Sequence, residues 1–212
     1  MNRDLHDLRV NYTASELLEM NIDSDPMVQF AHWFKEYERA AAHEANTVCL
    51  STYGNLGPSS RIVLLKSFDA RGFVFYTNYE SRKAKEAEAS AKVGMLFFWP
   101  ELERQLRVQG QIERIEESES DRYFNSRPFE SRMGALASNQ SKPIKDRAEL
   151  EYTYAELTKE WEGKEVERPK NWGGYRVVPI QMEFWQGRAS RLHDRIEYNK
   201  EGQAWKFQRL AP

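Results

Sequence analysis

Residues 25–43 carry a helical pattern of hydrophobic and polar positions. Apolar side chains recur there at helical spacing, at Met27, Phe30, Phe34 and Tyr37. Asp25 can cap the free N–H groups at the start of this helix, and Pro26 suits its first position, where an N–H would lack a partner. The polar residues before it, 1–24, are expected to form an N-terminal arm.

Between residues 47 and 115 the pattern changes to short apolar runs that are typical of strands. We expect strands at 47–53, 60–68, 73–78, 92–99 and 104–115, with turns at 54–59 and 69–72. One helix, 81–91, interrupts this block, with Ser81 as its N-cap. Strands that follow one another without alternating helices favour a small antiparallel barrel over a parallel βαβ sheet.

The C-terminal half adds helices first and strands afterwards. We expect helices at 119–128, 129–138 and 145–163, and closing strands at 175–186, 191–198 and 204–210. Pro128 separates the first two helices, and Gly163 suits the end of the third. The predicted fold is mainly β with flanking helices (α+β), with an arm at 1–24 and one domain at 25–212.

Composition limits the class of partner. A net charge of -2 gives no overall field that would attract nucleic acid or a membrane, so any affinity for anions must be local. Cys49 is the single cysteine and cannot form an internal disulfide, and the N-terminus lacks an apolar signal core. The longest apolar run, 93–99, is too short to span a bilayer. These features together predict a cytoplasmic protein.

The segment 183–195, EFWQGRASRLHDR, concentrates the candidate chemistry. It holds a tryptophan, three arginines and one of the four histidines of the chain. If a strand begins at Arg191, the side chains of Arg191, His193 and Arg195 share one face, with neighbours ~7 Å apart. Three basic groups so close together repel one another, so an anionic or π-rich partner is expected against them.

Three further groups of polar residues are candidates for binding anions. The predicted helix start at Ser81, Arg82 and Lys83 suits a phosphate, because free N–H groups and the helix dipole favour an anion there; a solvated helix start is the alternative. Arg61 and Lys66 are separated by an odd number of positions on one predicted strand, so their side chains would face opposite sides of the sheet. They are either two separate anion contacts or ordinary charges at the ends of a strand. The third group recurs at intervals of four residues, although Pro128 interrupts the helix that would align it: Tyr123, Arg127 and Ser131.

Several common sites are not supported. The histidines, His6, His32, His43 and His193, are dispersed and form no cluster with Cys49, so no metal site is predicted. Neither a glycine-rich dinucleotide fingerprint nor a P-loop occurs. Cys49 lies in an apolar strand without an adjacent base, which indicates a core residue and not a nucleophile.

A series of segments in fixed order resembles the pyridoxamine (pyridoxine) 5′-phosphate oxidase family. The segments are RIVLLK (61–66), FYTN (75–78), SRK (81–83), LERQ (102–105), YFNSRP (123–128), SNQS (138–141), NWGGYRV (171–177), EFWQGRASRLHDR (183–195) and RLAP (209–212). The resemblance implies an antiparallel FMN-binding split barrel that works as a homodimer, with FMN at the subunit interface. It also implies oxidation of pyridoxamine or pyridoxine 5′-phosphate to pyridoxal 5′-phosphate, with reduction of O2 to H2O2. A flavin is needed because no ordinary side chain accepts a hydride.

The same resemblance assigns roles to individual residues. Contacts to the FMN phosphate or its surroundings are implied for Arg61, Arg82, Lys83 and Ser141, and contacts to the rest of the cofactor for Tyr76, Thr77, Gln105, Gln140, Trp185 and Arg195, together with the strand residues Ile62, Val63, Leu64, Leu65 and Lys66. The substrate phosphate would be bound by Lys66, Tyr123, Arg127 and Ser131. The substrate ring would be held by Arg191, Leu192 and His193, and Arg191 or His193 is expected to assist proton transfer during hydride transfer.

The N-terminal arm departs from the family pattern. Where members carry LRREY, this chain has LRVNY (8–12), so that Arg9 and Tyr12 remain as expected substrate contacts while Val10 and Asn11 are changed. If the arm closes over the substrate, this change predicts weaker closure or an altered substrate preference.

Two other functions fit a split barrel. One is an FMN oxidoreductase with another substrate, and the other is a non-catalytic protein that carries FMN or pyridoxal phosphate. The complete RLHDR segment (191–195), together with the Tyr123, Arg127 and Ser131 set, argues against the first, since a generic flavin protein needs no second phosphate site. Intact Arg191 and His193 argue against the second.

Overall fold

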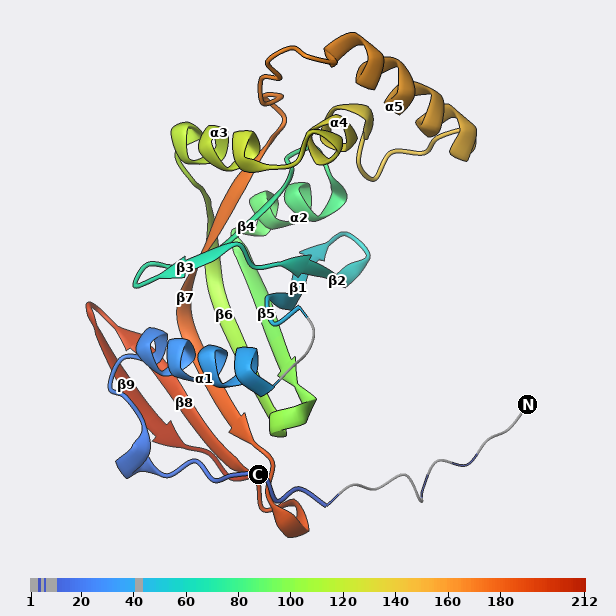
Figure 1. Cartoon of the computed structure of the whole chain (residues 1–212). Coiled ribbons are helices and arrows are strands. Elements are labelled where there is room, and N and C mark those ends of the chain that lie inside the picture. Colours follow the sequence, from blue (N-terminus) through green and yellow to red (C-terminus); the bar gives the residue numbers. More distant parts are fainter. Residues whose placement is uncertain (1–3, 5, 7–10, 41–43) are drawn as a thin grey trace. The chain divides into compact units, whose positions relative to one another are not determined.

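The computed structural model describes residues 4, 6, 11–40 and 44–212. The helices of these residues are α1 (Pro26–Ala40), α2 (Arg82–Ser90), α3 (Glu117–Ser126), α4 (Phe129–Ala137) and α5 (Arg147–Trp161) (Figure 1). The strands are β1 (Thr47–Gly54), β2 (Gly57–Leu64), β3 (Ser67–Asp69), β4 (Gly72–Asn78), β5 (Lys92–Trp99), β6 (Arg104–Arg114), β7 (Trp172–Gln186), β8 (Asp194–Glu201) and β9 (Ala204–Arg209). Short 3-10 helices are Glu19–Asn21, Pro100–Leu102 and Ala189–Arg191.

The strands are hydrogen-bonded in the order β2-β1-β5-β6-β7-β4-β3, and β8 pairs with both β7 and β9. The pairs β3–β4, β4–β7, β7–β8 and β8–β9 are antiparallel. The long strand β7 pairs with β4 through its first half, where Tyr76 is opposite Gly174. Through its second half it pairs with β8, where Trp185 is opposite Arg195. The predicted class, mainly antiparallel β with flanking helices, is confirmed.

The chain divides into two compact units. The first comprises residues 1–49, 94–109 and 179–212, and the second comprises residues 50–93 and 110–178. The first unit has an aromatic core between α1 and its strands. Phe30 and Trp33 are buried, and their ring centroids lie 5.1 Å from Phe97 and 5.0 Å from Phe184. Such aromatic pairs bury large apolar areas and stabilise the packing of α1 on the sheet.

The second unit has its own hydrophobic cluster, which supports the helices that follow β6. Phe124 of α3, Met133 of α4 and Trp172 of β7 are buried together with Val166. The α5 helix carries no buried residue, although Tyr154, Leu157 and Trp161 pack partly against this cluster. This side of α5 therefore packs only at the margin of the core.

Local chain chemistry explains the starts of three helices. Asp25 Oδ1 accepts from the Met27 N–H at 2.8 Å at the start of α1, and Asp146 caps α5 in the same way. Ser81 precedes α2 and accepts from the Ala84 N–H at 3.4 Å. The apolar stripe of α1 differs from the prediction at one position: Trp33 is buried, whereas Phe34 is only partly buried.

Several predicted strand boundaries are wrong. The turn expected at 54–59 is shorter, because β2 already begins at Gly57, and the strand expected at 60–68 ends at Leu64 and resumes as β3 at Ser67. The strand expected from Arg191 begins at Asp194. A 3-10 helix at Ala189–Arg191 precedes it, with left-handed φ values at Ser190 and Arg191. Arg191, His193 and Arg195 therefore do not alternate along one strand face.

None of the helices in the described residues is long and apolar enough to span a membrane.

Candidate functional site

The second unit contains a pocket of about 740 Å³. Its lining comes from β2, β4, α2, α3, α4, the start of β7 and the segments that connect them. It comprises Ile62, Val63, Leu64, Lys66, Tyr76, Thr77, Asn78, Lys83, Tyr123, Arg127, Pro128, Ser131, Gly134, Ala135, Ser138, Gln140 and Trp172. This lining includes three cationic side chains, those of Lys66, Lys83 and Arg127, and no carboxylate. A volume in the range of ligand pockets with unbalanced positive charge suits an anionic ligand.

Lys83 lies on the first turn of α2, and its ammonium group donates to three neutral oxygens. Its Nζ donates to Thr77 Oγ1 at 3.1 Å, to Gln140 Oε1 at 3.0 Å and to Ser81 Oγ at 3.3 Å. Burial, with a smaller contribution from Arg61, lowers the pKa of Lys83 to about 8. An anion beside Nζ would favour the charged form and relieve this shift.

Arg127 presents a second unpaired cation. Its buried Nη1 finds no hydrogen-bond partner among the described residues, and its guanidinium carbon lies 4.7 Å from the ring centroid of Trp172. Burial lowers the pKa of Arg127. A buried donor without a partner costs roughly 1–3 kcal/mol, more for a charged group, so this geometry indicates a missing acceptor.

The Tyr123, Arg127 and Ser131 set does converge, but not along one helix. Arg127 is extended (φ -77°, ψ 147°) at the end of α3, as the following Pro128 requires. Tyr123 and Ser131 belong to α3 and α4, and all three residues line the pocket. The corner between the helices brings the set together.

Tyr76 forms an aromatic wall of the pocket. Its ring stacks on Tyr123 with centroids 3.9 Å apart and on Trp172 with centroids 5.6 Å apart. Burial raises the pKa of Tyr76 to about 12, so it stays neutral at physiological pH. A Cβ on Gly174 would lie 2.9 Å from this ring and 2.3 Å from Ile115 Cδ1, which explains the glycine there. The sequence alone assigns no role to Trp172, which it includes only as part of the NWGGYRV segment.

Other predicted cofactor residues lie outside the lining of this pocket. Leu65 is buried. Arg61 and Arg82 are paired with Glu86. Ser141 has a φ of 70° and lines a smaller adjacent pocket that Gln140 also lines.

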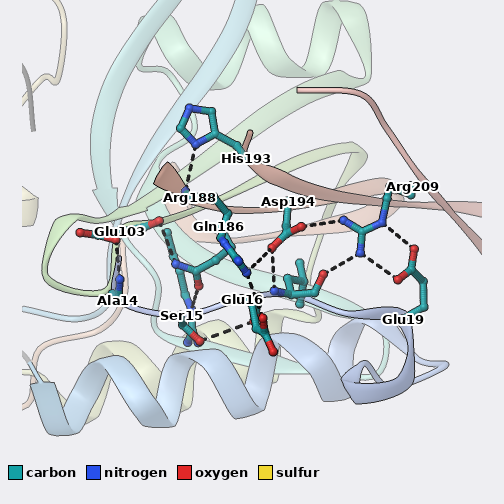
Figure 2. A network of polar contacts seen from close by, with 12 residues as sticks. Ala14, Ser15, Glu16, Glu19, Glu103, Gln186, Arg188, His193, Asp194 and Arg209 are labelled. Carbon is teal, nitrogen blue, oxygen red and sulfur yellow. Dashed lines mark hydrogen bonds and ion pairs between the residues drawn. The ribbon is translucent and has the colours of Figure 1, made fainter. Parts of the chain in front are cut away.

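In the first unit, the C-terminal segment packs on the N-terminal arm. Tyr12 contacts Trp185 edge-on, with centroids 5.9 Å apart, and lies 5.9 Å from His193, which is 4.5 Å from Trp185. The Arg188 N–H donates to His193 Nδ1 at 3.1 Å (Figure 2). Because a backbone N–H can only donate, the neutral His193 must carry its proton on Nε2. Partial burial, and then Arg191, lower the pKa of His193.

An ion-pair network fixes this arrangement, as Figure 2 shows. The Arg188 guanidinium pairs with Glu16 at 3.2 Å and with Asp194 at 3.3 Å. Arg209 pairs with Asp194 at 2.8 Å and with Glu19 at 2.6 Å. Sequence reasoning missed these residues, because only the fold brings partners such as Glu16 and Arg188 together.

The remaining C-terminal candidates are placed as follows. Arg195 Nε donates to Glu183 Oε1 at 2.8 Å and Nη1 donates to the Ala211 carbonyl at 2.8 Å, so its charge is partly compensated. Arg191 and Leu192 are exposed, and Gln105 is partly buried on β6. None of these side chains lines the 740 Å³ pocket. Arg9 and Val10 lie outside the described residues.

Among the residues that the structure describes, no group of three or more His, Cys, Asp or Glu side chains could hold a metal ion.

Solved structures place the fold in the split-barrel class. PhzG from Burkholderia lata 383, solved with tetrahydrophenazine-1-carboxylic acid, is similar with a TM-score of 0.87 and 32% identity over 94% of this chain and 100% of that one. A pyridoxamine 5′-phosphate oxidase-related, FMN-binding protein from Nostoc punctiforme shares the fold with a TM-score of 0.69 at 17% identity, over 93% and 100% of the two chains.

Sequence comparisons define the family. Residues 34–160 match the family model described as pyridoxamine 5′-phosphate oxidase, and residues 172–212 match the pyridoxine 5′-phosphate oxidase C-terminal dimerisation region. The pyridoxine/pyridoxamine 5′-phosphate oxidase of Rubrobacter xylanophilus is 54% identical over 99% of this chain and 97% of its own length. That of Trichormus variabilis is 48% identical over 100% of both. The chain belongs to the pyridoxamine 5′-phosphate oxidase family.

Proposed function

We propose that this protein is an FMN-dependent oxidase that converts pyridoxamine 5′-phosphate and pyridoxine 5′-phosphate to pyridoxal 5′-phosphate, with O2 reduced to H2O2. The observation that carries the proposal is the pocket with three cations and no carboxylate. Cofactor and substrate each bring one phosphate, so a single pocket that holds both requires more cationic groups than one anion would need.

The cations divide between the two phosphates. Lys83, with Arg61, Arg82 and Ser141, is assigned to the FMN phosphate, since the N-terminus of α2 adds free N–H groups and a favourable dipole there. Lys66, Tyr123, Arg127 and Ser131 are assigned to the substrate phosphate, and the unpaired Arg127 Nη1 is the donor that the phosphate would satisfy. The positive charges and hydrogen-bond donors of these residues fit both phosphate groups.

We assign contacts with the rest of the cofactor to Tyr76, Thr77, Gln105, Gln140, Trp185 and Arg195. The β2 residues Ile62, Val63 and Leu64 and the following Leu65 are assigned to the strand beside the cofactor. The flavin supplies the acceptor for two electrons and a hydride, which the side chains lack. The protein supplies orientation and electrostatics. Arg195 brings a cation that Glu183 partly compensates.

Arg191 and His193 are proposed to hold the substrate ring, with Leu192 beside them. His193 presents Nε2–H as a donor, because Nδ1 is occupied by the Arg188 N–H. We therefore assign His193 to hold an acceptor atom of the substrate. The arm residues Arg9 and Tyr12 are proposed to close over the substrate, and Tyr12 already packs against His193.

We also propose a homodimer with FMN at the interface and a cytoplasmic location. The match of residues 172–212 to a dimerisation region supports the homodimer, and this range includes Trp185, Arg191, His193 and Arg195. The single cysteine supports a reducing compartment.

The pH dependence of turnover tests the role of His193. As the pH falls through the lowered pKa of His193, Nδ1 gains a proton and can no longer accept from Arg188. We expect kcat to fall on the acid side with an apparent pKa below the usual value of about 6.5. The substrate phosphate also titrates near pH ~6, so the control is His193→Asn, whose Oδ1 can accept from Arg188 without titrating. The acid limb should be steeper in the wild type than in His193→Asn, and identical slopes would remove His193 from this role.

The function itself is tested with FMN-loaded protein and an oxygen electrode. Pyridoxamine 5′-phosphate should cause oxygen uptake, with one H2O2 and one aldehyde formed per turnover. Protein that cannot be loaded with FMN would contradict the proposal outright. The likeness to PhzG makes oxidation of another ring substrate the second candidate, and a yellow protein inert towards both vitamer phosphates would favour it.

A further inference from the structure

Glu86 of α2 lies within the cationic cluster at the start of that helix. Its Oε1 accepts from Arg82 Nε at 2.7 Å. Its Oε2 accepts from Thr52 Oγ1 at 2.6 Å and from Arg61 Nη2 at 3.4 Å. The Glu86 side chain is only 10% exposed and that of Arg61 20%, whereas that of Arg82 is 55% exposed, so the contact with Arg61 is the better shielded of the two ion pairs. One carboxylate thus bridges both arginines that are assigned to the cofactor phosphate.

The surroundings are shaped to keep this carboxylate ionised and in place. The hydrogen bonds from Thr52 and then Arg82 lower the pKa of Glu86. A Cβ on Gly54 would lie 2.7 Å from Glu86 Oε1, so glycine leaves the room that the carboxylate occupies. Glu86 is therefore held in a specific ion-pair site and does not lie on a solvated face of α2.

Arg61 does not depend on Glu86 alone. Its Nη1 donates to Thr52 Oγ1 at 2.7 Å and to the Leu50 carbonyl at 3.2 Å, and its Nη2 donates to Ser59 Oγ at 2.7 Å. Neutralising Glu86 without changing its shape should therefore leave Arg61 in position. The main consequence would be electrostatic: Arg61 and Arg82 would lose the carboxylate that they share, while Arg61 would still repel Lys83.

We propose that Glu86 is the internal counter-ion of the phosphate-binding cluster, which stabilises the protein without cofactor and weakens its affinity for the incoming phosphate of FMN. The inference rests on the proposed function, which places that phosphate at this cluster. Before the cofactor arrives, Glu86 offsets the repulsion among Arg61, Arg82 and Lys83. When the phosphate is bound, two anions share these cations and repel each other.

The test compares Glu86→Gln with wild-type apoprotein by FMN titration, followed through flavin fluorescence, and by thermal unfolding. We expect Glu86→Gln to lower the Tm of the apoprotein and to lower the Kd for FMN about 3- to 10-fold at low ionic strength. Inorganic phosphate should also raise the Tm of this variant more than that of the wild type. Both differences should shrink as salt is added.

Two control variants separate charge from other effects. Glu151→Gln makes the same change in net charge on exposed α5 and should alter neither quantity. Glu86→Asp keeps the charge and should bind FMN within about 2-fold of the wild type. This variant also keeps the proposal testable if Glu86→Gln does not fold.

The outcomes are distinguishable. A wild-type apoprotein that binds FMN while Glu86→Gln binds it equally or more weakly would overturn the inference and leave the proposed function intact. An altered affinity in Glu86→Asp beyond that 2-fold range would show that geometry and not charge decides, which also overturns it. Failure of the wild type itself to bind FMN would overturn the proposed function.

Discussion

Arg127→Ala is expected to lower kcat/KM for pyridoxamine 5′-phosphate by about 100- to 1000-fold, most of it through KM. The buried Nη1 of Arg127 has no partner in the described part of the protein, and Arg127 lines the pocket, so we expect its hydrogen bond to form only when a phosphate is bound. Removing a charge-assisted donor from a desolvated site costs several kcal/mol. Steady-state kinetics with phosphorylated substrate measure this directly.

The chain offers a matched control for this prediction. Arg132 on α4 also has a buried nitrogen without a partner among the described residues, Nε, but it does not line the pocket. Arg132→Ala should therefore leave KM unchanged, even if it alters stability. Arg127→Lys should recover only part of the activity, because an ammonium group cannot reproduce the planar fork of the guanidinium. An unchanged KM in Arg127→Ala would show that the substrate phosphate binds elsewhere.

Lys83→Met is expected to weaken FMN binding about 100-fold while stabilising the apoprotein by about 1 kcal/mol. Burial beside Arg61 lowers the pKa of Lys83 to about 8, so the charged form is disfavoured until an anion is present. Methionine keeps the length and the apolar stem but removes the charge. Flavin titration and urea unfolding of the apoprotein measure the two effects, which have opposite signs.

The pH dependence of stability gives an independent check on Lys83. Its folded pKa, about 8, lies below the ordinary value of 10.5, so between these values the unfolded chain binds more protons than the folded chain. The free energy of unfolding of the wild-type apoprotein should therefore gain from Lys83 as pH rises through this window. Lys83→Met should lack this gain. A variant whose stability follows the wild-type curve would show that Lys83 is not strained.

The sequence predicts the residues of the pocket more accurately than the local structure of the C-terminal segment. The helix start at Ser81 depends on local capping chemistry, and Tyr123, Arg127 and Ser131 are close to one another in sequence. Both features can therefore be predicted from the sequence alone. The strand expected from Arg191 was wrong because left-handed φ values at Ser190 and Arg191 are not encoded by residue type. The pattern of alternation alone cannot reveal such a break.

Long-range polar contacts were beyond sequence reasoning for a different reason. Glu16 and Arg188 are 172 positions apart, and Thr52 and Glu86 are 34 apart. Many charged residues could pair with each of them, and only the folded chain selects the partner. The resemblance to a family identified Arg61 and Arg82 as phosphate contacts, but it could not show that Glu86 already binds both.

The central claim is that one pocket brings a phosphorylated vitamer to a bound flavin for oxidation. Anaerobic mixing of the FMN-loaded protein with pyridoxamine 5′-phosphate tests this most directly, with the flavin absorbance followed in a single turnover. We expect the yellow colour to bleach with one equivalent of pyridoxal 5′-phosphate formed, and to return when air is admitted. Pyridoxamine without its phosphate should bleach the flavin far more slowly. A flavin that stays oxidised with the phosphorylated substrate, or one that bleaches equally fast with both amines, would contradict the account.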